Sequence, residues 1–128
     1  MPKQIIITAG QTAIQAELND SATAEAIAAV LPIEARANSW GAEIYFSIDV
    51  QAALEEGARD VVEAGDLAYW PPGSAFCIFF GRTPASSGDE IRAASAVNII
   101  GRVKGGLTPL GGVSDGASVT IRAALEGA

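Results

Sequence analysis

Five side chains in this sequence combine aromatic ring surface with polar groups in a way that suits a ligand pocket. Trp40 precedes a glycine, Glu43 and Tyr45 lie two residues apart, Trp70 stands directly before two prolines, and Arg92 lies further along the chain. In small-molecule sites, ring surface supplies affinity and a few polar groups fix the orientation of the ligand. We therefore predict these five as ligand-binding residues. The alternative is that the tryptophans and the tyrosine fill the protein core.

Glu90 and Arg92 are spaced so that they share one face of an extended strand. Such a pair either forms a salt bridge at the rim of a pocket or leaves the guanidinium to hold the carboxylate of a ligand. A plain surface ion pair is the simpler interpretation.

Acid–base chemistry in this chain would depend on carboxylates, because the chain has no histidine. Glu43, Glu63, Asp66 and Glu90 could in principle supply a catalytic pair. Acidic residues on the outward faces of strands are usually solvated, and we prefer that interpretation. No catalytic residue is assigned from the sequence.

The residue inventory excludes several common chemistries. The chain has no histidine, and Cys77 is its only cysteine. Zinc sites of ordinary composition and nucleophile pairs of the Ser/His or Cys/His type are therefore excluded, and we expect no metal and no cofactor. Cys77 stands among apolar residues, which predicts a buried and inert thiol. The glycine-rich stretch GGLTPLGGVSDG lacks a following Lys-Ser/Thr pair, so we read it as a loop and not as a phosphate cradle.

Charge and length set the broad class of the protein. Eight basic and fifteen acidic residues leave a net charge of −7, which repels phosphate backbones and anionic lipids. We therefore expect no nucleic-acid partner and no membrane partner, but a small molecule or a peptide, with a homo-oligomer left open. A single domain over residues 1–128 in a reducing, cytoplasmic setting fits this composition.

Alternating and β-branched patterns predict many short strands that must position these side chains. Ala42 to Ile48 gives the clearest alternation, with Ile44 and Phe46 on one face and Glu43 and Tyr45 on the other. The segment GDLAYWPPGSAFCIFFG predicts two strands broken by a Pro-Pro-Gly turn, because proline removes a backbone donor. The other predicted strands span 5–8, 14–18, 90–92, 97–103 and Ser118 to Leu125.

Helices are expected to be few. Asn19, Asp20 and Ser21 supply N-cap oxygens for a helix that Pro32 stops, and residues 49–58 predict a short helical turn. A polar stretch at 82–95 predicts a long surface loop that leads into the short strand at 90–92. Because about eight short strands leave many edges, we predict a mainly β protein, a closed eight-stranded barrel with one or two short helices.

Three motifs carry a resemblance to a known family. WGAEIYF, GDLAYWPPGSAFCIFFGRTP and NIIGRV together resemble the prokaryotic family of small cyclophilin-like proteins of unassigned function, and they span residues 40 to 103. The resemblance implies an eight-stranded cyclophilin-like barrel with helices at its ends. It does not imply isomerase activity.

The chain departs from true cyclophilins at their catalytic signature. The Phe-His-Arg motif is absent, and Arg36 lies in a comparable region without those neighbours, so we do not carry the role over. Residues 82–96 contain neither the tryptophan nor the histidine that line the proline pocket of cyclophilins. Three hypotheses follow: a non-catalytic binding module with an aromatic-lined pocket, a weak peptidyl-prolyl isomerase, and a structural protein that acts through oligomer contacts.

Overall fold

The described part of the chain folds into ten β-strands, one α-helix and two short 3-10 helices. This description comes from a computed structural model and covers residues 3–124. The elements are β1 (Lys3–Ala9), β2 (Thr12–Leu18), α1 (Ala22–Ala29), β3 (Ile33–Arg36), β4 (Asn38–Ser39), β5 (Glu43–Ser47), β6 (Arg59–Val62), β7 (Asp66–Trp70), η1 (Pro71–Gly73), β8 (Ala75–Phe79), β9 (Ile91–Lys104), η2 (Thr108–Gly112) and β10 (Ser118–Ala123).

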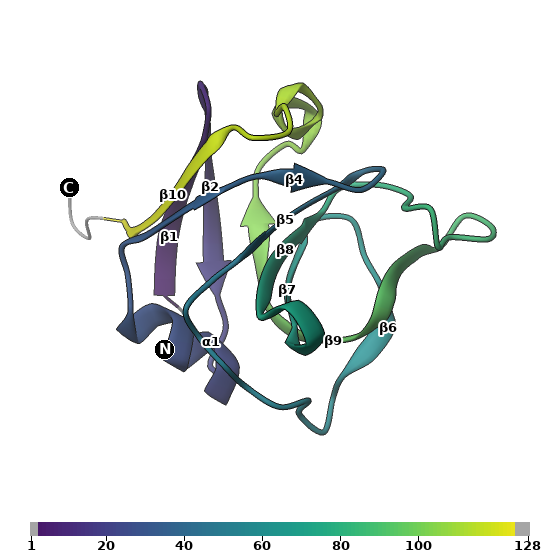
Figure 1. The fold of residues 1–128 in the computed structure, drawn as a ribbon, viewed down its shortest axis with the longest axis horizontal. Helices are drawn as coiled ribbons and strands as arrows, with labels where there is room; N and C mark the ends of the chain where they lie inside the picture. The colour runs from purple at the N-terminus through teal and green to yellow at the C-terminus, as the bar shows by residue number, and fades with distance from the viewer. Residues whose placement is uncertain (1–2, 125–128) are drawn as a thin grey trace.

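The strands form one antiparallel sheet that curls around a central core (Figure 1). Its order is β3-β10-β1-β2-β9-β7-β8-β5-β4, and β6 pairs with β9 outside this path. The two end strands, β3 and β4, follow each other in the chain and are separated only by Ala37. The protein is mainly β, as predicted. Strands β3 and β4 do not pair with each other, so the sheet is not closed and the predicted closed barrel of eight strands is not confirmed.

Strand β9 is the longest strand and holds two parts of the molecule together. Its first half pairs with β6, and its second half pairs with β7 on one side and β2 on the other. At Gly101 the backbone of β2 comes so close that a Cβ atom would lie 2.0 Å from the carbonyl oxygen of Glu17. Glycine is required at this crossing because no side chain fits there.

Two hydrophobic clusters lie on opposite faces of the β5-β8-β7 part of the sheet. The main core contains Ile44, Phe46 and Phe76, and the rings of the two phenylalanines stack at 5.3 Å. A smaller second cluster contains Cys77 and Phe79, together with residues of β6 and of the first half of β9. Because side chains alternate along a strand, β8 contributes to both clusters and is buried along its whole length.

Most of the predicted elements are present. The strands predicted at 5–8 and 14–18 are found as the hairpin β1–β2, the strand around Ile44 as β5, and the turn at the two prolines as η1. Helix α1 begins where predicted, with the Ser21 hydroxyl accepting a hydrogen bond from the Ala24 amide at 3.2 Å. The predicted final strand corresponds to β10, while its last residue, Leu125, lies outside the described residues.

Other predictions of local structure are wrong. Residues 49–58 contain no helix but only one hydrogen-bonded turn, in which the Ala58 amide donates to the Glu55 carbonyl at 3.0 Å. The amides of Ala52 and Glu55 donate to the side chains of Tyr69 and Asn98, which holds the rest of the segment against the sheet. The strands predicted at 90–92 and 97–103 are one strand, β9, so the surface loop ends at Glu90. Strands β3, β4 and β6 were not predicted, because each is short and has no clear alternation.

Candidate functional site

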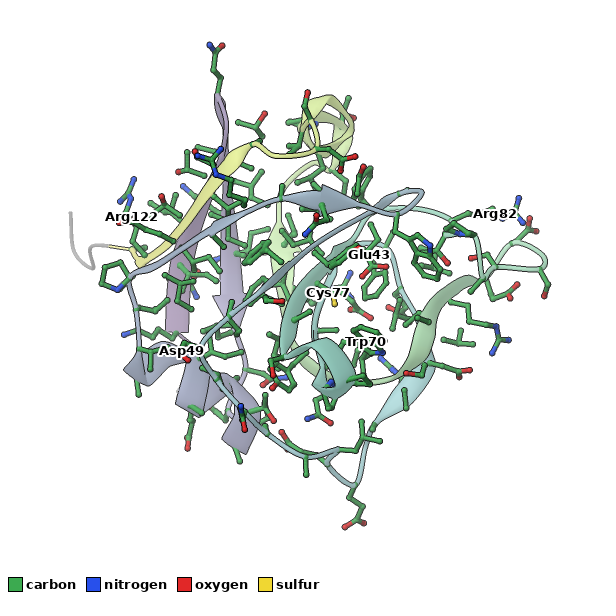
Figure 2. All side chains as sticks on the ribbon, viewed as in Figure 1. Glu43, Asp49, Trp70, Cys77, Arg82 and Arg122 are labelled. Atoms are coloured by element: carbon green, nitrogen blue, oxygen red, sulfur yellow. The ribbon has the colours of Figure 1, made fainter. Side chains whose placement is uncertain are left out.

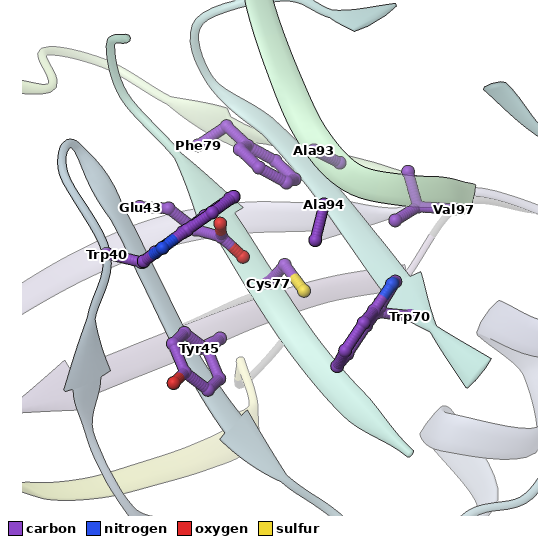
Figure 3. A pocket seen from close by; sticks show the side chains of 9 residues that line it. All are labelled: Trp40, Glu43, Tyr45, Trp70, Cys77, Phe79, Ala93, Ala94 and Val97. Atoms are coloured by element: carbon purple, nitrogen blue, oxygen red, sulfur yellow. The ribbon is translucent and has the colours of Figure 1, made fainter. Parts of the chain in front are cut away.

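A cavity of about 220 Å³ opens on the side of the sheet that faces away from the main core. The ladder between β5 and β8 sets Tyr45 opposite Cys77 and Glu43 opposite Phe79. These side chains point into the cavity, and the first half of β9 forms its opposite wall (Figure 3). The lining residues are Trp40, Glu43, Tyr45, Trp70, Cys77, Phe79, Ala93, Ala94 and Val97.

Trp40 reaches the cavity from the tight turn that joins β4 to β5. The Trp40 amide donates to the Glu43 carbonyl at 2.9 Å, and Gly41 adopts a φ of +62°. A Cβ atom on Gly41 would lie 2.9 Å from the carbonyl oxygen of Arg82 and from Cδ of Pro84. The turn therefore requires glycine both for its backbone conformation and for its close packing against the loop that follows β8.

Trp70 is held at the end of β7 by contacts on both sides of its indole. The indole Nε1 donates to the Ser95 hydroxyl of β9 at 2.7 Å. The ring also packs over Gly73, where a Cβ atom would lie 3.0 Å from two ring carbons. In the close view Trp40 and Trp70 stand on different sides of the cavity, with Glu43 and Cys77 between them (Figure 3).

Glu43 is the one acidic side chain of the wall, and it is 6% exposed. Burial raises the pKa of its carboxyl from 4.5 to about 7, and the adjacent Cys77 thiol offsets part of this rise. Among residues 3–124, no lysine or arginine forms an ion pair with Glu43. The cavity therefore contains a carboxyl group that changes charge near neutral pH.

Cys77 lies beside Glu43 in the centre of the site (Figure 2). The thiol is a free cysteine, and its residue is 2% exposed. Burial raises the pKa of the thiol well above its usual value, and the negative charge of Glu43 raises it further. Cys77 is therefore protonated and a poor nucleophile at neutral pH, as expected for a buried thiol.

Four of the five predicted site residues, Trp40, Glu43, Tyr45 and Trp70, line this one cavity. Arg92 does not line it. Its guanidinium is engaged in ion pairs with Asp60 at 2.7 Å and Glu90 at 3.3 Å.

The four carboxylates considered for a catalytic pair lie in different surroundings. Asp66 is buried and forms an ion pair with Arg102 at 2.7 Å, while Glu63 is exposed and lies 3.4 Å from the same guanidinium. Backbone amides of Ser87 and Gly88 bind the Glu90 carboxylate and lower its pKa to about 2. Glu43 therefore remains as the carboxyl of the pocket.

The sequence reasoning missed the contribution of Cys77 and Phe79 to the wall. Both lie in a predicted strand, Ala75 to Phe80, that is apolar on both faces, so the sequence does not show which face meets a cavity. Cys77 and Phe79 alternate with Phe76 and Ile78, so they share one face of the strand. The register that pairs Tyr45 with Cys77 shows that this is the face next to Tyr45. Ala93 and Ala94 carried no signal, because they fall in the predicted surface loop, and Val97 was predicted only as the first residue of a strand.

No group of three or more acidic or cysteine side chains within residues 3–124 is arranged to hold a metal ion. In the same part of the chain, every helix is too short or too polar to cross a membrane.

Comparison with known proteins places this architecture in a family. No curated protein matches the chain. The solution structure of a hypothetical protein from Archaeoglobus fulgidus is similar to it, with a TM-score of 0.79, 46% sequence identity and coverage of 95% of both chains. The family model described as Cyclophilin-like matches residues 3–122. The chain therefore belongs to the cyclophilin-like family.

Proposed function

We propose that this protein is a small-molecule-binding module and that the cavity between β5, β8 and β9 is its ligand site. The observation that carries the proposal is the convergence of Trp40, Tyr45 and Trp70 with a buried carboxyl, Glu43, on one cavity. A mostly apolar hollow with a few polar groups is the usual form of a small-molecule site.

The construction of the walls also supports binding. The indole of Trp70 is fixed by a hydrogen bond to Ser95, and the turn that holds Trp40 is packed against Arg82 and Pro84. A ligand that enters between such walls loses little free energy to the ordering of protein side chains. The floor, formed by Cys77 and Phe79, belongs to the second hydrophobic cluster and is closely packed.

Ligand-observed NMR with a library of small metabolites tests this function. We expect saturation-transfer signals from members that bind the native protein, and loss of these signals in Trp40→Ala. Arg122→Gln is the matched control, because Arg122 is exposed on β10, far from Glu43 and Cys77 (Figure 2). Absence of binding to the native protein across the library at millimolar concentration would refute the proposal.

The two other hypotheses have less support. A prolyl isomerase needs a donor for the prolyl nitrogen, and no arginine stands among the nine residues that line the cavity. A protein that assembles through an apolar surface needs an extensive exposed patch, whereas only three large apolar residues of the described chain, Val30, Leu54 and Val61, are exposed. A protease-coupled isomerase assay and sedimentation at high concentration test these alternatives.

A further inference from the structure

We propose that the ligand of this pocket is a small organic cation, an alkylammonium group held by the Glu43 carboxylate between the rings of Trp40, Tyr45 and Trp70. This inference rests on the proposed binding function and names the chemical class that the site selects.

The first argument is the unbalanced charge at the centre of the site. Ionised Glu43 is removed from water, and the other side chains of the wall are aromatic, aliphatic or, at Cys77, a thiol. The nearby arginines are engaged elsewhere, Arg92 with Asp60 and Glu90, and Arg82 with the Ser86 carbonyl at 3.3 Å. A buried carboxylate without a cationic partner is unfavourable, and a cation in the cavity supplies the missing charge.

The second argument is the composition of the walls. The faces of tryptophan and tyrosine attract cations, and aromatic cages bind quaternary ammonium groups in this way. An anionic ligand would meet the Glu43 charge with no arginine or lysine on the lining to compensate. A neutral apolar ligand would fill the space without the charge pairing that an ammonium group gives the ionised carboxyl. The lining therefore discriminates by charge.

The third argument is size. A cavity of about 220 Å³ holds the volume of roughly seven water molecules at about 30 Å³ each. This space fits a trimethylammonium group with a short chain and is too small to enclose a nucleotide or a large cofactor. The net charge of −7 adds a field that favours the approach of cations.

The titration of Glu43 gives the proposal a specific pH signature. A cation binds the ionised carboxyl, so affinity rises as pH rises through the pKa of about 7 and then levels off. The other titratable groups on the lining are Tyr45, on the same strand, and Cys77, on β8. The raised pKa of Cys77 keeps its thiol neutral over this range. The flanking loop carries Arg82, Asp89 and Glu90, and β9 carries Arg92, Arg102 and Lys104, but none of these lines the cavity.

Choline and 3,3-dimethyl-1-butanol, its uncharged analogue of the same shape, are the matched probes. We measure their affinities by NMR titration between pH 5.5 and 8. We expect choline to bind at least about tenfold more tightly than the alcohol at pH 8, and its affinity to rise about thirtyfold over this range. Glu43→Gln should remove both the preference and the pH dependence, while Tyr45→Phe should weaken binding and keep the midpoint. A short peptide bearing trimethyllysine distinguishes a peptide-borne ammonium group from a free one.

The possible results separate the two proposals. Equal or tighter binding of the alcohol, or choline affinity that falls with rising pH, overturns the cation assignment. If neither probe nor the peptide binds, the charge of the binders from the metabolite library decides: cationic binders that depend on Glu43 support the assignment, and neutral or anionic binders overturn it while the binding function stands. If nothing binds, both proposals fail.

Discussion

Glu43 and Cys77 are diagonal neighbours on adjacent strands, β5 and β8, because Glu43 pairs with Phe79 and Cys77 with Tyr45, and both lie on the side of the sheet turned away from the main core (Figure 3). This diagonal arrangement places a carboxyl beside a thiol, which is a weak hydrogen-bond donor. A carboxyl in these surroundings gains little stabilisation of its charged form, so it keeps its proton to a higher pH. The predictions below follow from this relationship and from the turn that completes the pocket.

The carboxyl of Glu43 should titrate with a midpoint of about pH 7, because burial disfavours its ionised form. The measurement is the pH dependence of the side-chain carboxyl carbon in NMR of protein labelled with 13C-glutamate, with Glu43→Gln identifying the resonance. A midpoint near 4.5 would show that water reaches the carboxyl freely and would contradict the buried position.

Removal of this acid should change how stability depends on pH. The folded pKa of about 7 lies above the ordinary value of 4.5, so the folded protein binds more protons between these values, and the free energy of unfolding falls as pH rises from 4.5 to 7. Glu43→Gln should remove this decline. Its stability relative to the native protein should therefore increase by on the order of 3 kcal/mol across the window, measured by urea unfolding. Glu63→Gln is the control, because the Glu63 side chain is 75% exposed, and it should show no such change.

Gly41→Ala should destabilise the turn that carries Trp40. The new Cβ atom would lie 2.9 Å from the Arg82 carbonyl oxygen, and the φ of +62° is unfavourable for alanine. We expect a loss of about 2–4 kcal/mol in urea unfolding, together with an altered Trp40 environment in fluorescence. Gly105→Ala isolates the backbone cost, because Gly105 has a φ of +91° with no atom within 4 Å, and it should lose only about 1 kcal/mol. Equal losses of unfolding free energy in the two variants would show that the packing against Arg82 does not contribute to stability.

Cys77 should resist alkylation in the folded protein. Its burial hinders access, and its raised pKa keeps the thiolate fraction low at pH 8. We expect iodoacetamide, followed by mass spectrometry, to modify the folded chain at least about tenfold more slowly than the chain in urea. Glu43→Gln should react somewhat faster than the native protein, because it removes a charge that opposes the thiolate. Labelling of the native protein at the unfolded rate would be inconsistent with this site.

The sequence predicted those elements whose local pattern is strong. Strand β5 follows from the alternation around Ile44, and helix α1 follows from Ser21, whose hydroxyl caps it. Strands β3, β4 and β6 could not be predicted, because two to four residues hold too little periodicity and their pairing depends on strands distant in the chain. The open ends at β3 and β4 likewise depend on tertiary structure, because a closed ladder is a property of all the strands together.

For the site, the sequence by itself determined that Glu43 and Tyr45 share a strand face and that Trp40 and Trp70 stand beside rigid turns. Local geometry suffices for these statements, since alternation and the restricted φ of proline act within a few residues. Only the tertiary structure decided that the first half of β9 covers this face, that Glu43 is thereby desolvated, and that Arg92 pairs with Asp60 instead. The surroundings of a side chain, and therefore its pKa and its partners, come from segments far away in sequence, and periodicity indicates a face but does not reveal what covers it.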